Sequence, residues 1–145
     1  MLTFEIYQPL VVQKQTRFFK CNNSIRGYDP SKSDKESIIW QVKPFAPESP
    51  MTGAISLTLT FFREVPKSVS STKRRQMLNH VILPVTRPDI DNYAYIVTNA
   101  LKELVYQDDS QICELICRKF YGTEPKTVIQ VRELLTMESG LECGL

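Results

Sequence analysis

Two pairs of aspartates flank one amphipathic segment in the middle of the chain. Asp89 and Asp91 precede it and Asp108 and Asp109 follow it, in the string RPDIDNYAYIVTNALKELVYQDDSQ. Between the pairs, apolar residues recur at the i, i+3, i+4, i+7 spacing of one helix face. They are Tyr93, Ile96, Val97, Ala100, Leu101 and Leu104. This spacing predicts a single-faced helix that runs to about Val105, with acidic groups at both ends.

The two acidic pairs are candidates for one metal site. Asp89 and Asp91 are two residues apart, so their side chains point to the same side of an extended segment. A helix of about 14 residues is roughly 21 Å long, so the second pair reaches the first only if the chain folds back. Converging carboxylates need a cation, and hard oxygen ligands suit Mg²⁺ or Mn²⁺ rather than zinc. Such a site suits phosphodiester hydrolysis by a metal-activated water.

The same residues also have a plainer interpretation. D-x-D-N is a frequent helix cap and turn, and then no metal is involved. An EF-hand loop is excluded, because its sixth position would be Ala94 instead of glycine and its twelfth Ala100 instead of glutamate. The spacing leaves the metal site and the cap as alternatives.

Patterns in the rest of the chain predict one α+β domain with a mixed or antiparallel sheet and packed helices. The strand patterns cover residues 4–9, 54–61, 111–121 and 127–135. We expect the last two to be antiparallel partners joined by a turn. Further helices are expected over residues 33–42 and 70–79, and Ser70 or Ser71 is the expected N-cap of the second. The domain is expected to cover residues 1–136, and residues 137–145 a flexible tail.

Charge is distributed unevenly along the chain. Residues 1–88 hold 13 basic and 6 acidic residues, a net of +7, whereas residues 89–109 hold one basic and five acidic residues, a net of −4. A basic majority beside a compact acidic spot suits an enzyme that holds a polyanion such as DNA and places metal ions on it. The plainer interpretation is ordinary surface charge with chance clustering.

Two basic segments precede the acidic site. Lys14 and Arg17 lie in QKQTRFFK, where cations are interleaved with aromatic residues, and such a mixture can hold phosphates and lay rings beside bases. The second segment is the short helix that carries Lys73, Arg74 and Arg75. Both segments are candidates for DNA contact, and the alternative is a solvated face.

The cysteines and the single histidine argue against structural zinc. Cys21, Cys113, Cys117 and Cys143 form no C-x-x-C pair, and the histidine is His80. Free thiols in a reducing cytoplasm are the expected state. The chain has no apolar run of about 18 residues, and its N-terminus lacks the pattern of a signal peptide.

The string RPDIDNYAYIVTNALKELVYQDDSQI resembles the signature of the RusA family of Holliday-junction resolvases, which is [KR]-P-D-x-D-N, a helix, and x-D-D-x-Q-[IV]. The segments QKQTRFF, GYDPSKSDKE, FFREVPKSVSSTKR and KFYG resemble other parts of that family. The resemblance therefore extends over nearly the whole chain. It implies a homodimeric, Mg²⁺-dependent endodeoxyribonuclease that places paired nicks across a four-way DNA junction in recombination and repair.

The resemblance also implies roles for individual residues. By motif position, Asp89, Asp91 and Asp109 resemble the family's catalytic, metal-binding carboxylates. Asp108 is the adjacent fourth candidate for the metal, and Asn92 resembles a family asparagine that orients a ligand or caps the helix. The residues expected to contact DNA are Lys14, Arg17, Lys73, Arg74, Arg75, Arg87 and Lys119.

Two positions depart from the family pattern. Tyr95 stands where the family usually has a lysine beside the metal site, and Asn99 stands where many relatives have aspartate. Tyr95 lies one helical turn from Asp91 and can donate a hydrogen bond, but it carries no positive charge. Arg87, Lys102 or another basic residue would have to replace it. This departure keeps two alternatives open: a junction-binding protein with weak or no catalysis, and a nuclease for flaps and other branched DNA.

Overall fold

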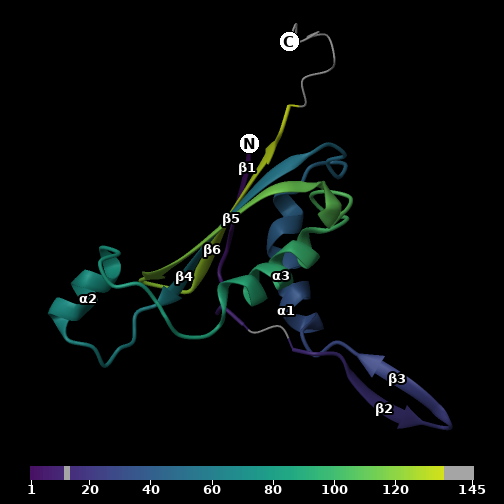
Figure 1. Cartoon of the computed structure of the whole chain (residues 1–145), viewed down its shortest axis with the longest axis horizontal. Helices are drawn as coiled ribbons and strands as arrows, with labels where there is room; N and C mark the ends of the chain where they lie inside the picture. Colours follow the sequence, from purple (N-terminus) through teal and green to yellow (C-terminus); the bar gives the residue numbers. More distant parts are fainter. Residues whose placement is uncertain (12–13, 136–145) are drawn as a thin grey trace, which may run out of the picture.

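A four-stranded mixed sheet carries the fold (Figure 1). In spatial order its strands are β1 (Leu2–Ile6), β6 (Lys126–Glu133), β4 (Ile55–Glu64) and β5 (Ile112–Gly122). β6 pairs antiparallel with both β1 and β4, and β5 pairs parallel with β4. The computed structural model describes residues 1–11 and 14–135, so the predicted tail at residues 137–145 lies outside the described residues. The predicted α+β class is confirmed.

β4 occupies the centre of the sheet, between β6 and β5. It is the most deeply buried strand, and Ile55, Leu57, Leu59 and Phe61 are all fully buried. These side chains belong to the core cluster between the sheet and its helices. The predicted antiparallel pairing of residues 111–121 with residues 127–135 is therefore wrong, because β4 lies between those two strands.

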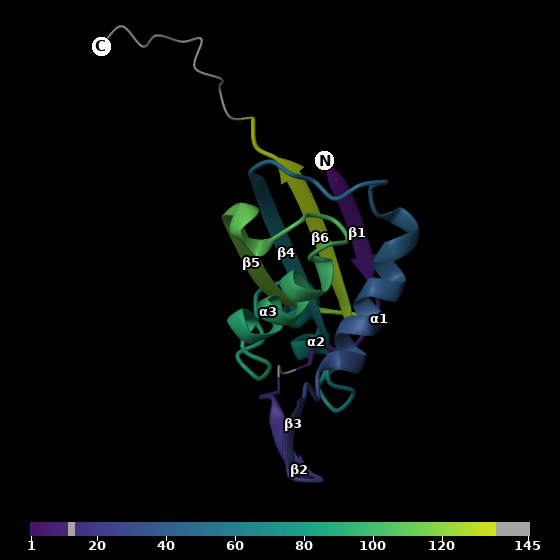
Figure 2. The same ribbon diagram turned by 90° about the vertical axis from the view of Figure 1, so that its right-hand side faces the viewer.

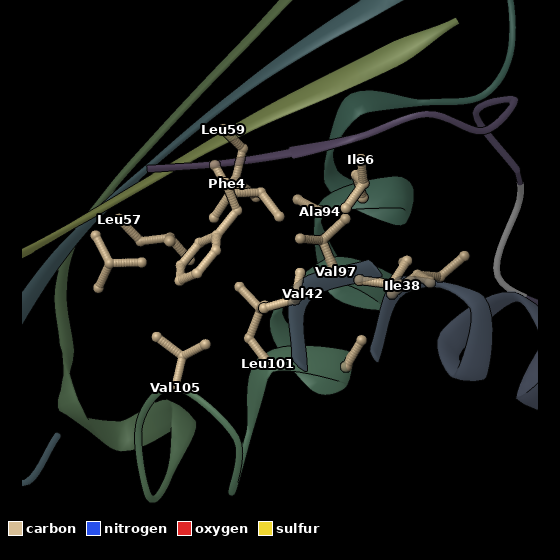
Figure 3. Close-up of a cluster of buried hydrophobic side chains, with 14 of the residues drawn as sticks. Phe4, Ile6, Ile38, Val42, Leu57, Leu59, Ala94, Val97, Leu101 and Val105 are labelled. Atoms are coloured by element: carbon tan, nitrogen blue, oxygen red, sulfur yellow. The ribbon is translucent and has the colours of Figure 1, made fainter. Parts of the chain in front are cut away.

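Two helices, α1 (Lys32–Val42) and α3 (Ile90–Leu101), cover one face of the sheet (Figures 1 and 2). Their apolar faces meet the sheet in one core cluster, part of which is drawn in Figure 3. In α3, the ring of Tyr93 packs edge-on against Phe61 of β4 with a centroid distance of 4.9 Å. This packing fixes how α3 lies on the sheet.

Within residues 1–11 and 14–135, every helix is too short or too polar to span a lipid bilayer.

α3 ends earlier than the sequence predicts. Its last residue is Leu101, and Lys102 already has an extended backbone, with φ −59° and ψ 137°. Glu103 follows with a positive φ of 65°, which turns the chain. Leu104 and Val105 continue the helical spacing in the sequence. They also pack on the core, but they lie in the turn after the helix.

α2 (Ser71–Leu78) lies beyond the end of the sheet, away from α1 (Figure 1). The predicted cap is confirmed, because the Ser70 hydroxyl accepts a hydrogen bond of 3.2 Å from the backbone N–H of Lys73. Met77 of α2 packs with Val65 and Tyr121 in a second, smaller apolar cluster. This cluster packs α2, which carries the three cations, against the end of β5.

A two-stranded hairpin projects from the opposite end of the molecule (Figures 1 and 2). It is formed by β2 (Arg17–Cys21) and β3 (Ser24–Tyr28), which pair antiparallel. The sequence patterns did not predict this hairpin. Its turn lies at Asn22 and Asn23, with φ of 45° and 63°, and asparagine tolerates such angles in two-residue hairpin turns.

Candidate functional site

Asp89 and Asp91 lie together at the N-terminal end of α3. Asp89 is the N-cap residue and Asp91 is in the first turn, and both are exposed. The Asp89 side chain makes no capping hydrogen bond, although it holds the capping position. The helix dipole stabilises negative charge at this end. Both carboxylates therefore face solvent at the N-terminal end of the helix.

Two cationic side chains hold the backbone that leads into Asp89. The Lys119 ammonium on β5 donates hydrogen bonds to the carbonyl oxygens of Thr86 at 2.9 Å and of Pro88 at 3.0 Å. The Arg63 guanidinium on β4 donates to the carbonyl oxygen between them, that of Arg87. Lys119 was predicted to contact DNA. Two of its three N–H donors are used by the protein itself, so its first role is to position this segment.

Asp108 lies at the other end of α3, in an ion pair with Lys102 at 2.8 Å. Its second carboxylate oxygen accepts the backbone N–H of Ser110. The hydrogen bond from the Lys102 ammonium holds the pKa of the Asp108 carboxyl well below its usual range. Asp108 is thus a charged residue with its oxygens already engaged, which makes it the weaker of the two adjacent metal-ligand candidates.

Gln111 fixes the turn that carries both acids. Its side-chain oxygen accepts the backbone N–H of Asp108, and its amide nitrogen donates to the carbonyl oxygens of Met51 and Gly53. With the Asp108 side chain, these bonds form a capping box on the short 3-10 helix Asp109–Gln111. The D-x-x-Q spacing is the sequence signal that could have identified Gln111 as the residue that anchors this turn.

Asp109 is half-buried, and one of its oxygens is unusual. Oδ1 is buried and accepts no hydrogen bond from the described residues. Its negative charge adds to burial in raising the pKa of the neighbouring Tyr106. A buried carboxylate oxygen without a donor costs about 1–3 kcal/mol, so it needs a compensating group. A hard cation is such a group, and in this respect Asp109 fits the predicted metal chemistry.

A single chain does not bring the three predicted metal ligands together. α3 has 12 residues and is therefore about 18 Å long, with Asp91 in its first turn and the Lys102–Asp108 ion pair past its last. Among residues 1–11 and 14–135, no three His, Cys, Asp or Glu side chains are grouped so that they could hold a metal ion. The fold-back that a one-chain site requires is not found.

The part of the chain that returns along α3 is β5, not the second acidic pair. β5 begins at Ile112, directly after the short 3-10 helix Asp109–Gln111, and carries Lys119 back to the backbone before Asp89. Asp109 stays where β5 begins, beside the start of β4, because Ile112 pairs with Ile55 there. One chain therefore holds the candidate ligands in two separate groups, called half-sites below: Asp89 with Asp91, and Asp109.

A groove of about 340 Å³ runs between α3 and β5 from the first half-site. Tyr95 and Leu115 line it and are 55% and 48% exposed, so much of its surface is apolar. Tyr95 has a cation nearby, since the Lys35 ammonium lies 6.0 Å from the centre of its ring. Lys35 in turn pairs with Asp29 at 2.7 Å. Tyr95 itself lies on the exposed face of α3, one turn from Asp91.

The other predicted DNA contacts are spread over the molecule. Arg17 is on the hairpin, and Lys14 precedes it, with its backbone N–H bonded to the Ser31 hydroxyl at 2.9 Å. The cations of α2 are exposed at the far end of the molecule (Figure 1). Arg87 is exposed next to the first half-site. Asn92 is half-buried in the first turn of α3.

Comparisons with known proteins identify the family of the chain. A family model described as "Endodeoxyribonuclease RusA" matches residues 8–132, a range that contains both half-sites. The chain is also 34% identical over 137 residues to the uncharacterized protein YqaN of Bacillus subtilis (strain 168). That match covers 92% of this chain and 96% of the relative.

Proposed function

Because this chain belongs to the RusA family of endodeoxyribonucleases, we propose that it resolves four-way DNA junctions by paired nicks in a Mg²⁺-dependent reaction, with Mn²⁺ as a substitute. The observation that carries the proposal is the pair of half-sites at the two ends of α3. Their carboxylates are the ligands that Mg²⁺ prefers, and Asp109 has a buried oxygen without a donor among the described residues. The cations of the hairpin and of α2 supply charge for a large polyanion.

We infer that two chains complete each metal site. Asp91 and Tyr95 are exposed on α3, and Lys102, which follows the helix and pairs with Asp108, is exposed as well. If two such helices cross antiparallel about a two-fold axis, Asp89 and Asp91 of one chain face the partner's Asp109. The symmetry produces this contact twice, so one dimer has two equivalent sites. Two sites related by a two-fold axis suit symmetric nicks in two strands.

The groove between α3 and β5 supports a second copy as the occupant of this face. It lies along the same helix and exposes Tyr95 and Leu115. β5 is also an edge strand of the sheet, and an edge strand exposes unpaired backbone groups that a partner can cover. Exposed apolar side chains beside an open edge are typical of a surface that is buried in an assembly.

In this proposal Asp89, Asp91 and the partner's Asp109 hold the metal. A bound Mg²⁺ supplies a metal-activated water and neutralises the charge that develops on the leaving 3′ oxygen. Lys119 and Arg63 keep residues 86–88 in place before Asp89, which orients the first two carboxylates. The products are a 5′-phosphate and a 3′-hydroxyl, ends that a ligase can rejoin.

One face of the hairpin combines two guanidinium groups with two aromatic rings. Arg17 and Phe19 of β2 lie on the same face because alternate residues of a strand do so. Their cross-strand partners are Tyr28 and Arg26 of β3. The rings of Phe19 and Tyr28 are 6.2 Å apart, centre to centre, which agrees with this register. Cations for phosphates beside rings for bases suit a branch point, where bases are partly unstacked.

We expect the double substitution Arg17→Gln with Arg26→Gln to weaken junction binding and to reduce its salt dependence. Each lost phosphate contact lowers the slope of log K against log salt by about 0.9 on duplex DNA, so the double variant should lose about two units of slope. Binding titrations over a range of salt concentrations measure it. Lys43→Gln, an exposed cation past the other end of α1, is the matched control. An unchanged slope in the double variant would exclude the hairpin as a DNA contact.

The proposed function is tested with labelled four-way junctions, flaps and linear duplexes, each with and without Mg²⁺. We expect paired nicks in the junction with Mg²⁺ or Mn²⁺ and none without metal. Binding of the junction without nicks in either metal would show a junction-binding protein instead of an enzyme. Faster cutting of flaps than of junctions would assign the protein to other branched DNA.

A further inference from the structure

A cleft of about 550 Å³ lies beside the backbone that leads into the first half-site. It forms where the segment after β1, the end of β4, the backbone before Asp89 and the turn before β6 meet. The residues that line it are Pro9, Leu10, Arg63, Glu64, Val65, Pro66, Lys67, Arg87, Pro88 and Pro125. Of these residues, the sequence predicted a functional role for Arg87 alone.

The cleft is suited to an anion. Arg63, Lys67 and Arg87 bring three positive charges to it, and Glu64 brings the only acidic group among its lining residues. The guanidinium of Arg63 is oriented by its hydrogen bond to the Arg87 carbonyl oxygen. A guanidinium that is held in this way loses little side-chain entropy when its remaining N–H groups bind a phosphate.

The rest of the cleft wall is apolar and rigid. Four of the lining residues are prolines, which have no backbone N–H and a fixed φ angle. Together with Val65 they form a surface against which a flat or ring-shaped group can pack without leaving polar backbone groups uncovered. A cleft that combines cations with prolines matches the two parts of a nucleotide, its phosphate and its sugar and base.

The cleft is also close to the proposed cutting site. Arg87 and Asp89 are separated only by Pro88, so their Cα atoms are at most about 7.6 Å apart. The side chains of Lys119 and Arg63 hold this backbone in place by hydrogen bonds to its carbonyl oxygens. A DNA strand that reaches Asp89 therefore passes the cleft within about one nucleotide.

We propose that this cleft binds a nucleotide of the cut strand next to the phosphate that is hydrolysed, with its phosphate on Arg63, Lys67 and Arg87. This inference rests on the proposed function, because it identifies the substrate contacts beside the same site. It makes Arg63 and Lys67 substrate-binding residues. The cleft thereby sets the position of the strand along the active site.

The first test is Lys67→Gln, because Lys67 is exposed and its replacement leaves the bonds of Arg63 intact. We expect junction affinity to fall roughly tenfold at about 0.1 M salt and the salt slope to fall by about one unit, as for one lost phosphate contact. The Lys43→Gln variant, with the same charge change far from the cleft, should keep the slope of the original protein. Equal slopes for both variants and the original protein would overturn the proposal.

The second test does not depend on cutting. Thymidine 5′-monophosphate is titrated into the full chain, and the backbone amide signals of Arg63, Val65 and Arg87 are followed by NMR. We expect saturable shifts at these residues, weaker shifts with thymidine, and a several-fold weaker response in Lys67→Gln. Shifts that are absent, or that occur on the hairpin instead, would overturn the cleft while junction cutting still supports the proposed function. If the nucleotide binds in the cleft but the protein cuts no junction, the proposed function is refuted and the nucleotide site is still supported.

Discussion

The Asp91→Asn variant is expected to bind four-way junctions as well as the original protein and to cut them at least about a hundredfold more slowly. Loss of a group that only supports a metal ligand usually costs 10–100-fold, so loss of a ligand itself should cost more. Asparagine has nearly the same shape and can still accept hydrogen bonds, so the exposed helix start should keep its structure. In the proposed function, cations on other elements carry the binding of the junction, so we expect binding to persist.

Two measurements separate these effects. Junction affinity is titrated without metal, and the rate of nicking is measured at saturating protein with Mg²⁺. Glu48→Gln is the matched control, because it also converts an exposed carboxylate to an amide, but in the linker between α1 and β4. Cleavage by Asp91→Asn at the rate of Glu48→Gln would refute the role of Asp91 as a metal ligand.

Local structure followed from the sequence where one residue pattern decides it. β4 and α3 were predicted because apolar residues recur with periods of two and of 3.6, and Ser70 was identified as a cap by its residue type. Strand partners were not predictable in the same way. The pattern of β6 fits equally well beside β5 or β4, and the central place of β4 follows only when all four strands compete for neighbours.

The boundaries of two elements were missed for local reasons. Leu104 and Val105 continue the helical spacing, but the turn at Glu103 brings them to the core without a helix. The hairpin of β2 and β3 has exposed apolar residues on both faces, so it lacks the alternation by which strands are recognised. Asn22-Asn23 was its one turn signal.

The candidate site divides in the same way. The acidic residues, and their places at the ends of one helix, could be read from the sequence. Their separation could not, because it depends on where β5 joins the sheet, and that is fixed by Ile112 pairing with Ile55. The cleft beside Arg87 combines four distant segments and has no sequence pattern at all.

Cations from other elements lie near the first half-site, where the chain has tyrosine instead of lysine at position 95. Lys119 reaches the backbone next to Asp89 from β5, and Lys35 lies beside the Tyr95 ring from α1. Lys102, one of the candidates for replacing the lysine, is committed to Asp108 at the other end of the helix. Positive charge near the first half-site therefore comes from several elements instead of one turn of α3.

The central claim is that each cutting site takes Asp89 and Asp91 from one chain and Asp109 from its partner. It predicts that two inactive variants restore activity when they are combined. In a dimer of one Asp91→Asn chain and one Asp109→Asn chain, one site carries both substitutions and the other carries none. The intact site should nick one strand of the junction at a rate near that of a single original site. Paired cuts should remain absent.

The most direct measurement of this claim uses heterodimers made from chains with two different affinity tags and purified on both. Nicking of one strand of a labelled junction is followed with Mg²⁺. A heterodimer of Asp89→Asn with Asp91→Asn is the matched control and should stay inactive, because both substitutions affect the same half-site and every site is damaged. A dimer of two unsubstituted, differently tagged chains should give paired nicks. We expect single-strand nicks from the combination of Asp91→Asn and Asp109→Asn, and an inactive heterodimer of these two variants would contradict the shared site.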